Sequence, residues 1–412
     1  MLLSLSSQNV IQYLQAAGLC SLEDGITDKS ELPGSSKKNF NLRVTLADNH
    51  KLLIKQENRL ANENHPHEFF NEWLFQQLLS KFPVLGNIEA IASLVVHYDA
   101  ENYILVRNYL SDYLALQDFY QNHHLYPVEI ATAIGTTIAS LHRATFQRRE
   151  YRDFMLTAPE GMFRYHFYNP AQGIESLTPE IFGAVPEEAL QFYTFYQRYE
   201  SLESAIADLA YEWQPCCLTH NDLQLNNILL HSRWDKLDNC LVKLIDWEAC
   251  AWGDPAFDLG TLIASYLNIW LSSLVVDPIL DLEESLQLAI TPLEIIQPSL
   301  LALIQAYFQE FPAILEHRQD FIARVIQFAG LGLIHQLQAK IQFQQQFDNA
   351  DMYALQVAQD LLTTPDKSVA TIFGVSESAI VVTMAEPHQI YQPQKEQKLI
   401  PLYYTKTRLR GC

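Results

Sequence analysis

The chain has 412 residues, which at roughly 100–200 residues per domain suits two to three domains. Hydrophobic residues make up 49% and charged residues 18%, a balance that supports a buried core and argues against general disorder. Its 27 Lys and Arg against 48 Asp and Glu give a net charge of −21. That charge disfavours nonspecific binding to nucleic acid or to an anionic membrane face, because both need a basic surface.

The cysteine content and the apolar segments indicate a cytoplasmic protein. Six cysteines without a CxxC pair are too few for a disulfide framework, so we expect a reducing compartment. The first residues, MLLSLSSQNVIQYL, lack the basic start of a signal peptide. Residues 259–276 carry no charge, but six polar side chains interrupt them and Asp258 and Asp277 bracket them. We therefore expect a buried helix there and no membrane span.

The first hundred residues predict a small antiparallel sheet with one main helix. Residues 8–18 form a short amphipathic pattern that ends at Gly18, and apolar positions at helical spacing predict a longer helix over 67–82, ended by Pro83. A turn signal at 47–50 joins the first two strands into a hairpin, whose second strand ends at Lys55. The predicted strands are 40–44, 52–55, 92–96 and 103–107.

Past Tyr109 the pattern becomes mainly helical. Residues 150–190 are rich in aromatic side chains, Pro and Gly, and predict an irregular insertion. Residues 217–247 predict short strands around a polar loop. Helices are predicted over 126–146, 186–210 and, in succession, 258–363. After Pro365 the helical period stops, so we divide the chain into a lobe over 1–108, a second lobe over 109–365 and a tail over 366–412.

Two polar motifs stand at the ends of predicted strands. Residues 217–230, CLTHNDLQLNNILL, have the form H-x-D-x-x-x-x-N with His220, Asp222 and Asn227. Residues 244–260, LIDWEACAWGDPAFDLG, place Asp246 directly after two apolar strand residues, and Asp258 follows downstream. One carboxylate can accept the proton of an attacking hydroxyl, while a carboxamide and a second carboxylate supply the hard oxygen ligands that Mg²⁺ prefers. The pattern therefore predicts phosphoryl transfer from ATP.

The two motifs together resemble those of the aminoglycoside phosphotransferase and choline kinase family. Members typically carry H-G-D-x-H-x-x-N and I-D-W-E-x-A-x-x-G-D-P-x-x-D-L, and the second motif matches here at nearly every position. The first departs at Asn221, where Gly is usual, and at Gln224, where His is usual. The resemblance covers roughly residues 8–360 and implies an α+β, two-lobed protein-kinase-like fold, with a small antiparallel-sheet lobe carrying one helix and a larger, mainly helical lobe.

The resemblance also implies the roles of the motif residues. Asp222 would be the catalytic base, Asn227 and Asp246 would hold Mg²⁺, and His220 and Asp258 would support the catalytic loop. The enzyme class that follows is an ATP-dependent phosphotransferase with an alcohol group as acceptor. The acceptor itself does not follow, because one fold serves many substrates.

The first lobe carries the remaining residues that this fold needs. Lys55, at the end of a strand, would contact the phosphates of ATP, and Glu72 in the following helix would pair with it. Glu68, one turn earlier, is the alternative partner. Ser35 and Ser36 lie where the family has a turn over the phosphates, although the segment is not a G-x-G-x-x-G loop. Residues 105–110, which include Asn108 and Tyr109, resemble the linker whose backbone meets adenine.

Other functions stay open at this point. The same machinery serves kinases of Ser or Thr on a protein or peptide, and a pseudokinase would keep the fold as a binding module. Cys216, Cys217, His220 and Asp222 do not have the spacing of a structural zinc site. The net charge favours a cationic or neutral polyol acceptor, whereas an anionic acceptor would need Arg or Lys in its pocket. One basic cluster could supply those side chains: Arg143, Arg148, Arg149 and Arg152.

Overall fold

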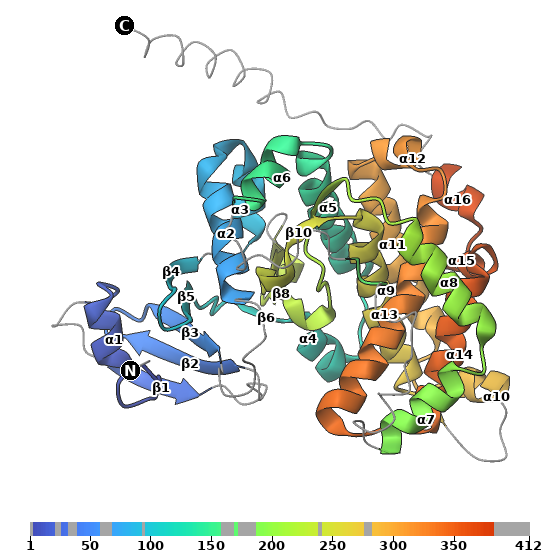
Figure 1. Ribbon diagram of the computed structural model, residues 1–412, viewed down its shortest axis with the longest axis horizontal. Coiled ribbons are helices and arrows are strands. Elements are labelled where there is room, and N and C mark those ends of the chain that lie inside the picture. The colour runs from blue at the N-terminus through green and yellow to red at the C-terminus, as the bar shows by residue number, and fades with distance from the viewer. Residues whose placement is uncertain are drawn as a thin grey trace, which may run out of the picture.

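The protein has the α+β, two-lobed protein-kinase-like fold that the motifs predict (Figure 1). A small sheet with a helix on it forms one lobe, and a bundle of helices around two short sheets forms the other. The computed structural model describes residues 3–20, 26–31, 39–57, 68–92, 95–157, 169–171, 187–237, 241–275 and 282–382.

The small lobe is built on a five-stranded antiparallel sheet in the order β1-β2-β3-β5-β4. Alternate apolar residues of its inner strands pack with Val10 and Leu14 of α1 (Val10–Ala16), which covers one face of the sheet. The predicted hairpin and the two later strands are confirmed, whereas the first strand was not predicted. The strands are β1 (Ile26–Glu31), β2 (Asn39–Leu46), β3 (Lys51–Glu57), β4 (Val95–Asp99) and β5 (Ile104–Asn108).

Helix α2 (Glu68–Lys81) stands between the sheet and the large lobe (Figure 1). On the sheet side, Phe69 packs with Val95 and Leu105, and Trp73 packs against the same cluster. The apolar residues further along the helix belong to the core of the large lobe, where the ring of Phe75 stacks on Trp247 with centroids 4.1 Å apart. The chain then runs through the short helices η2 (Pro83–Leu85) and α3 (Gly86–Ile91), which were not predicted.

In the large lobe, two short sheets present the polar motifs. One pairs β7 (Cys217–Thr219) with β10 (Ala251–Gly253), and the other has the order β6-β8-β9. The short helix η6 (Trp247–Ala249) follows Asp246 directly, and η4 (Leu225–Asn227) lies just after Asp222 in the other motif. The second sheet consists of β6 (Tyr113–Ala115), β8 (Ile228–His231) and β9 (Val242–Leu244).

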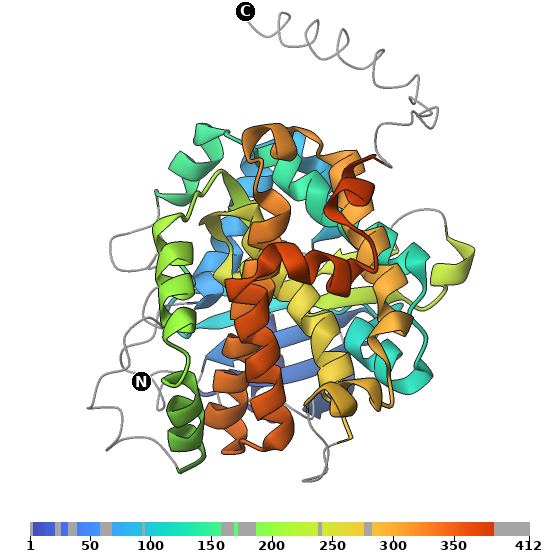
Figure 2. The same ribbon diagram turned by 90° about the vertical axis from the view of Figure 1, so that its right-hand side faces the viewer.

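Long helices enclose these sheets. The helix α5 (Val128–Thr145) packs along α11 (Leu293–Glu310), and the buried α9 (Pro255–Leu271) packs along α13 (Phe321–Gln344). In Figure 2 the orange-red α13 and α14 run through the middle of this lobe, with the green α7 and α8 at one edge. The others are α4 (Leu116–His123), α6 (Arg149–Met155), α7 (Glu187–Tyr196), α8 (Glu200–Tyr211), η5 (Trp234–Lys236), α10 (Leu282–Gln287), α12 (Ala313–His317) and α14 (Asn349–Thr363).

Gly260 allows α9 and α13 to approach closely. A Cβ atom built at Gly260 would lie 2.4 Å from the Cβ atom of Phe328 and 2.7 Å from its carbonyl carbon, closer than real atoms come. The absence of a side chain at this position therefore sets the spacing of the two helices, and with it the place of Asp258 half a turn earlier.

The expected end of the helical pattern at Pro365 is wrong. Pro365 is the first residue of α15 (Pro365–Phe373), a position where its missing N–H costs nothing. Gly374, with φ +71°, ends that helix, and α16 (Glu377–Val382) follows. Residues 383–412 and most of the predicted insertion over 150–190 lie outside the described residues. The lobe boundary between residues 108 and 109 stays a prediction.

None of the helices in the described part of the chain is long and apolar enough to cross a membrane.

Asp254 joins the start of α9 to two arginines of the later helices. Its Oδ1 accepts a hydrogen bond from the backbone N–H of Ala256, as an N-cap does, at 3.1 Å. Its Oδ2 accepts one from Nη1 of Arg318 at 3.0 Å and lies 3.8 Å from Nη2 of Arg324. All three side chains are buried, so the pairing compensates charges that would be costly alone.

We expect Asp254→Asn to lower the free energy of unfolding by about 3 kcal/mol, because it leaves two buried guanidinium groups without their shared carboxylate. Asp320 is a matched control, since it also pairs with Arg318, at 3.1 Å, but is exposed. Asp320→Asn should lower the free energy of unfolding by less than ~1 kcal/mol. Urea denaturation measures both variants, and equal losses would contradict the role given to Asp254.

Candidate functional site

The catalytic loop between β7 and η4 depends on an unusual backbone conformation at Asn221. Its φ of +63° lies in the left-handed region, which Gly adopts freely and Asn tolerates better than other residues. The Asn221 side chain also holds the loop, because Oδ1 accepts a hydrogen bond from the Thr219 hydroxyl at 2.8 Å and Nδ2 donates to the Ala249 carbonyl at 3.0 Å. The departure from the family's Gly therefore preserves the loop.

Asp258, fully buried on α9, supports this loop from below. Its Oδ2 accepts from the backbone N–H of His220 and its Oδ1 from that of Asn221, both at 2.7 Å. The Nε2 atom of His142, on α5, lies 3.1 Å from Oδ2, and the Nδ1 atom of His142 lies 2.9 Å from the Tyr307 hydroxyl. His142 therefore fixes Asp258 from the side of α5, although the two residues lie 116 positions apart in the sequence.

His220 links the loop to the second motif through both ring nitrogens. Its Nε2 donates to the Ile245 carbonyl at 2.8 Å, and its Nδ1 accepts from the Asp222 backbone N–H at 3.3 Å. A carbonyl can only accept and an N–H can only donate, so these partners fix the neutral tautomer with the proton on Nε2. The contacts agree with the supporting role proposed for His220.

The carboxylate of Asp222 is held by two carboxamides. Nε2 of Gln224 donates to Oδ1 at 2.7 Å, and Nδ2 of Asn227 donates to Oδ2 at 2.8 Å. Burial raises the pKa of Asp222, although these hydrogen bonds and His220 oppose the change. The result is an oriented carboxylate that binds a proton more readily than an exposed one. Gln224 thus supplies an N–H donor at the position where the family usually has His.

Asp246 receives two cations of the small lobe. Its φ of +62° turns the side chain out of the end of β9. Its Oδ1 lies 2.5 Å from Nζ of Lys55 and 2.9 Å from Nη1 of Arg107. Burial disfavours the charged carboxylate, yet the two positive charges outweigh that effect and hold the pKa of Asp246 well below its usual range. Asp246 is therefore ionised at neutral pH.

The predicted pair of Lys55 with Glu72 is not formed. Nζ of Lys55 bonds Asp246, and the neighbour of Glu72 is Arg107, whose Nη1 lies 3.4 Å from Oε1. Oε2 of Glu72 is buried without a hydrogen-bond partner among the described residues, and burial raises the pKa of Glu72 despite the nearby cations. Glu68 begins α2, and its side chain lies outside the described residues.

Sequence reasoning missed Arg107, which is 5% exposed. It stands near the end of β5, and the strand's earlier residues are apolar and buried. A guanidinium in such a strand must find carboxylate partners, and it finds both Glu72 and Asp246. The charged residue within an apolar strand is the signal that could have indicated it.

The other predicted nucleotide-binding residues are only partly placed. Ser35 and Ser36 lie outside the described residues. Oδ1 of Asn108 accepts a hydrogen bond from Nε2 of His50 at 2.9 Å. The backbone N–H of Tyr109 donates to the Lys51 carbonyl at 2.8 Å, so it is not free to bind adenine. A contact of the linker with adenine would have to use other backbone groups.

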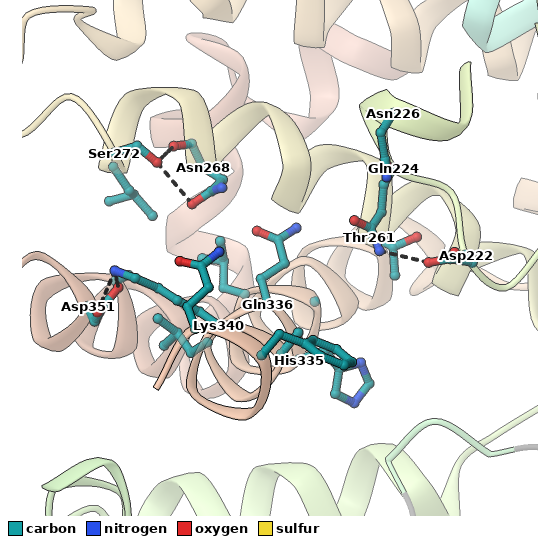
Figure 3. A pocket seen from close by; sticks show the side chains of 18 of the residues that line it. Asp222, Gln224, Asn226, Thr261, Asn268, Ser272, His335, Gln336, Lys340 and Asp351 are labelled. Atoms are coloured by element: carbon teal, nitrogen blue, oxygen red, sulfur yellow. Dashed lines mark hydrogen bonds and ion pairs between the residues drawn. The ribbon is translucent and has the colours of Figure 1, made fainter. Parts of the chain in front are cut away.

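Two adjoining cavities share part of their lining, and the larger one opens beside Asp222. The main compartment, about 890 Å³, lies between the catalytic loop, α9, α13 and the start of α14 (Figure 3). The side compartment, about 470 Å³, lies between α4, α9 and residues 290–291. Neither is lined by the predicted basic cluster on α5 and α6. Four residues line both compartments and form what we call the shared wall: Gln224, Asn268, Ser272 and Gln336.

The fold and this site define a phosphotransferase. The sequence model of the phosphotransferase enzyme family matches residues 90–289, a segment that contains both polar motifs. This match confirms the predicted resemblance and the predicted enzyme class, a phosphotransferase with an alcohol group as acceptor. No curated protein matches the sequence.

Solved structures with the same fold are similar to this chain at low sequence identity. Amicoumacin kinase hAmiN, in complex with AMP-PNP, Ca²⁺ and Ami, has 11% identity and a TM-score of 0.50, over 87% of this chain and 93% of its own. Choline kinase LicA from Streptococcus pneumoniae has 16% identity and a TM-score of 0.45, over 87% of this chain and 99% of its own. A choline/ethanolamine kinase family protein from Mesorhizobium loti has 14% identity and a TM-score of 0.47, over 89% and 99%. At such identities the likeness shows the fold alone.

We expect Glu72 and Arg107 to be strongly coupled in stability. Arg107→Met leaves Glu72 without its cation and should lower the free energy of unfolding by about 3–5 kcal/mol. The loss of unfolding free energy in the double variant Glu72→Leu/Arg107→Met should be smaller, by at least ~1 kcal/mol, than the sum of the losses in the two single variants.

Urea denaturation of the four proteins measures this coupling. The control is the surface pair Arg143 and Glu310, in which Nη2 lies 2.6 Å from Oε1. Its double-variant cycle should give a coupling energy below ~1 kcal/mol. Additive losses at residues 72 and 107 would show that the two side chains act independently.

Proposed function

We propose that the protein transfers the γ-phosphoryl group of ATP to a hydroxyl of a small molecule, with Mg²⁺ bound by Asn227 and Asp246. The observation that carries the proposal is the position of Asp222, whose carboxylate is held by Gln224 and Asn227 and faces the main compartment of the cavity. An oriented carboxylate beside a cavity of this size suits a base for a small acceptor.

The residues present fit a magnesium ion. Nδ2 of Asn227 donates to Asp222, so the amide oxygen of Asn227 is directed away from Asp222. The backbone carbonyl of Asn227 accepts a hydrogen bond from the N–H of Ile245, the residue before Asp246. Mg²⁺ uses one or two protein oxygens together with substrate phosphates, so Asn227 and Asp246 would be sufficient protein ligands. When bound, it would neutralise phosphate charge.

The chain's own groups would then divide the work. Asp222 would accept a hydrogen bond from the acceptor hydroxyl, orient its oxygen toward the γ-phosphorus and take its proton as the new P–O bond forms. Lys55, on the small lobe beside Asp246, would place a positive charge against the phosphates. His220 and Asp258 would keep the loop rigid while this happens. Phosphoryl transfer needs mainly such positioning and charge compensation.

ATP is the proposed donor on two grounds. The family of the matched segment is a phosphotransferase family, and the structure of amicoumacin kinase hAmiN holds AMP-PNP and Ca²⁺ in a chain of the same fold. Two alternatives from the sequence are less well supported. A protein or peptide acceptor does not need a cavity of about 890 Å³ beside Asp222. A pseudokinase would not need the ionised Asp246 and the oriented Asp222 together.

We expect saturating ATP to raise the melting temperature in the presence of Mg²⁺ and much less in the presence of EDTA. The reason is that a ligand which binds only the folded state adds its binding free energy to stability, by ~2.7 kcal/mol at a hundred times Kd. A thermal-shift titration measures the effect. No stabilisation by Mg-ATP would contradict the proposed function.

Asp222→Asn and Asp246→Asn should fail in different ways. Asp222→Asn keeps the shape but removes the proton acceptor, so we expect at least a ~10²-fold loss of kcat with nearly unchanged nucleotide affinity. Asp246→Asn should also weaken binding of Mg-ATP. Because burial raises the pKa of Asp222, wild-type activity should fall with acidification already above pH ~3.9. Steady-state kinetics and nucleotide titrations measure these effects, and equal loss of binding in both variants would contradict the assigned roles.

A further inference from the structure

The charged side chains of the main compartment are already paired. Nζ of Lys340 lies 2.7 Å and 2.8 Å from the two carboxylate oxygens of Asp351 and 3.2 Å from Oδ2 of Asp348. Asp348 and Asp351 also cap the start of α14, each accepting a backbone N–H of the other. Burial lowers the pKa of His335 to about 4, so this lining histidine is neutral at pH 7. Lys340 balances one of these two carboxylates, and the backbone N–H groups at the start of α14 compensate the other. Asp222 is then the carboxylate left to face an acceptor.

The side compartment carries no Asp, Glu, Lys or Arg among its described lining residues. Its polar groups are hydroxyls and carboxamides, such as those of Gln117, Gln121 and Thr291, together with the imidazole of His124. The rings of Tyr120 and Tyr126 have centroids 5.0 Å apart there, but no carboxylate among the described lining residues stands beside them to help hold a cation. Among its described lining residues, the compartment therefore has no carboxylate for an ammonium and no Lys or Arg for a carboxylate.

The shared wall presents neutral groups that both donate and accept hydrogen bonds. Its residue Gln224 donates to Asp222, so the wall reaches the proposed base directly (Figure 3). Oε1 of Gln336 is buried and has no hydrogen-bond partner among the described residues, although Gln336 lines both compartments. A buried acceptor without a donor is costly, and a hydroxyl from a bound molecule would satisfy it. Carboxamides suit hydroxyl groups, which donate and accept in the same way.

From these contacts we infer that the acceptor is a neutral, polyhydroxylated molecule of the sugar or glycoside kind, bound against the shared wall with parts in both adjoining compartments. The inference rests on the proposed function and names its substrate class. The hydroxyl to be phosphorylated lies in the main compartment at Asp222, and a second hydroxyl donates to Gln336. The remainder of the molecule extends into the side compartment, since a single sugar ring is small for a cavity of this total size.

The first test offers wild type γ-labelled ATP, Mg²⁺ and three sets of hydroxyl compounds matched in size. One set holds neutral sugars and glycosides of one to three rings, one holds amino sugars and amino alcohols, and one holds sugar acids. We expect labelled product from the neutral set, with two-ring compounds better than one-ring compounds. Label only in a charged set overturns the inference and leaves the proposed function standing. No label in any set, although Mg-ATP stabilises the protein, contradicts the proposed function itself.

The second test places the acceptor in the cavity. Gln336→Leu removes the hydrogen-bonding group of the shared wall and should raise KM for the neutral acceptor about tenfold, with KM for ATP unchanged. Gln121→Leu, in the side compartment, should raise KM for two-ring acceptors only. Gln191→Leu, an exposed change on α7 outside the cavity, is the matched control and should change neither constant. If Gln336→Leu folds and leaves the acceptor KM as in wild type, the inference is wrong.

Discussion

A single carboxylate oxygen of the large lobe, Oδ1 of Asp246, holds two cations that belong to the sheet of the small lobe. Lys55 comes from β3 and Arg107 from β5, and these strands are direct neighbours in the sheet. The pairing fixes where the sheet stands relative to the second motif, and so where a nucleotide between them would meet Asp222. Because the cluster is largely buried, removing one member leaves the others uncompensated, which makes this contact more consequential than any exposed ion pair of the molecule.

The sequence predicted the parts of the site that lie close together in the chain. His220, Asp222 and Asn227 lie in one loop. Asp246 and Asp258 belong to the second motif and lie twelve positions apart in the sequence. The partner of Lys55 was predicted wrongly, because ion pairing depends on tertiary positions that no local pattern records. Arg107 pairs with Glu72, and Lys55 and Arg107 both pair with Asp246. The shared wall could not be predicted from a local pattern either, because Gln224, Asn268 and Gln336 come together only when α9 and α13 pack. Likewise, Pro365 looked like a helix end but begins one.

The two departures from the family's first motif have opposite consequences. Asn221 replaces Gly without changing the loop, since Asn accepts the left-handed backbone and its side chain adds two hydrogen bonds. Gln224 replaces a titratable imidazole by a carboxamide that keeps a donor on Asp222 at every pH. One substitution thus preserves geometry, whereas the other removes a group that could change charge beside the base and the acceptor cavity.

The packing of α2 determines which parts of the small lobe can move together. Asn71 donates hydrogen bonds to the carbonyls of Glu248 and Cys250 at 2.8 Å and 2.7 Å, and Phe75 stacks on Trp247, so the helix is fastened to the large lobe. Phe69 and Trp73 of the same helix pack against Val95 and Leu105 of the sheet, so α2 is held from both sides. A motion that separated the lobes would have to break one of these two sets of contacts. It would also have to part Lys55 and Arg107 from Asp246, so the buried ion pairs oppose it.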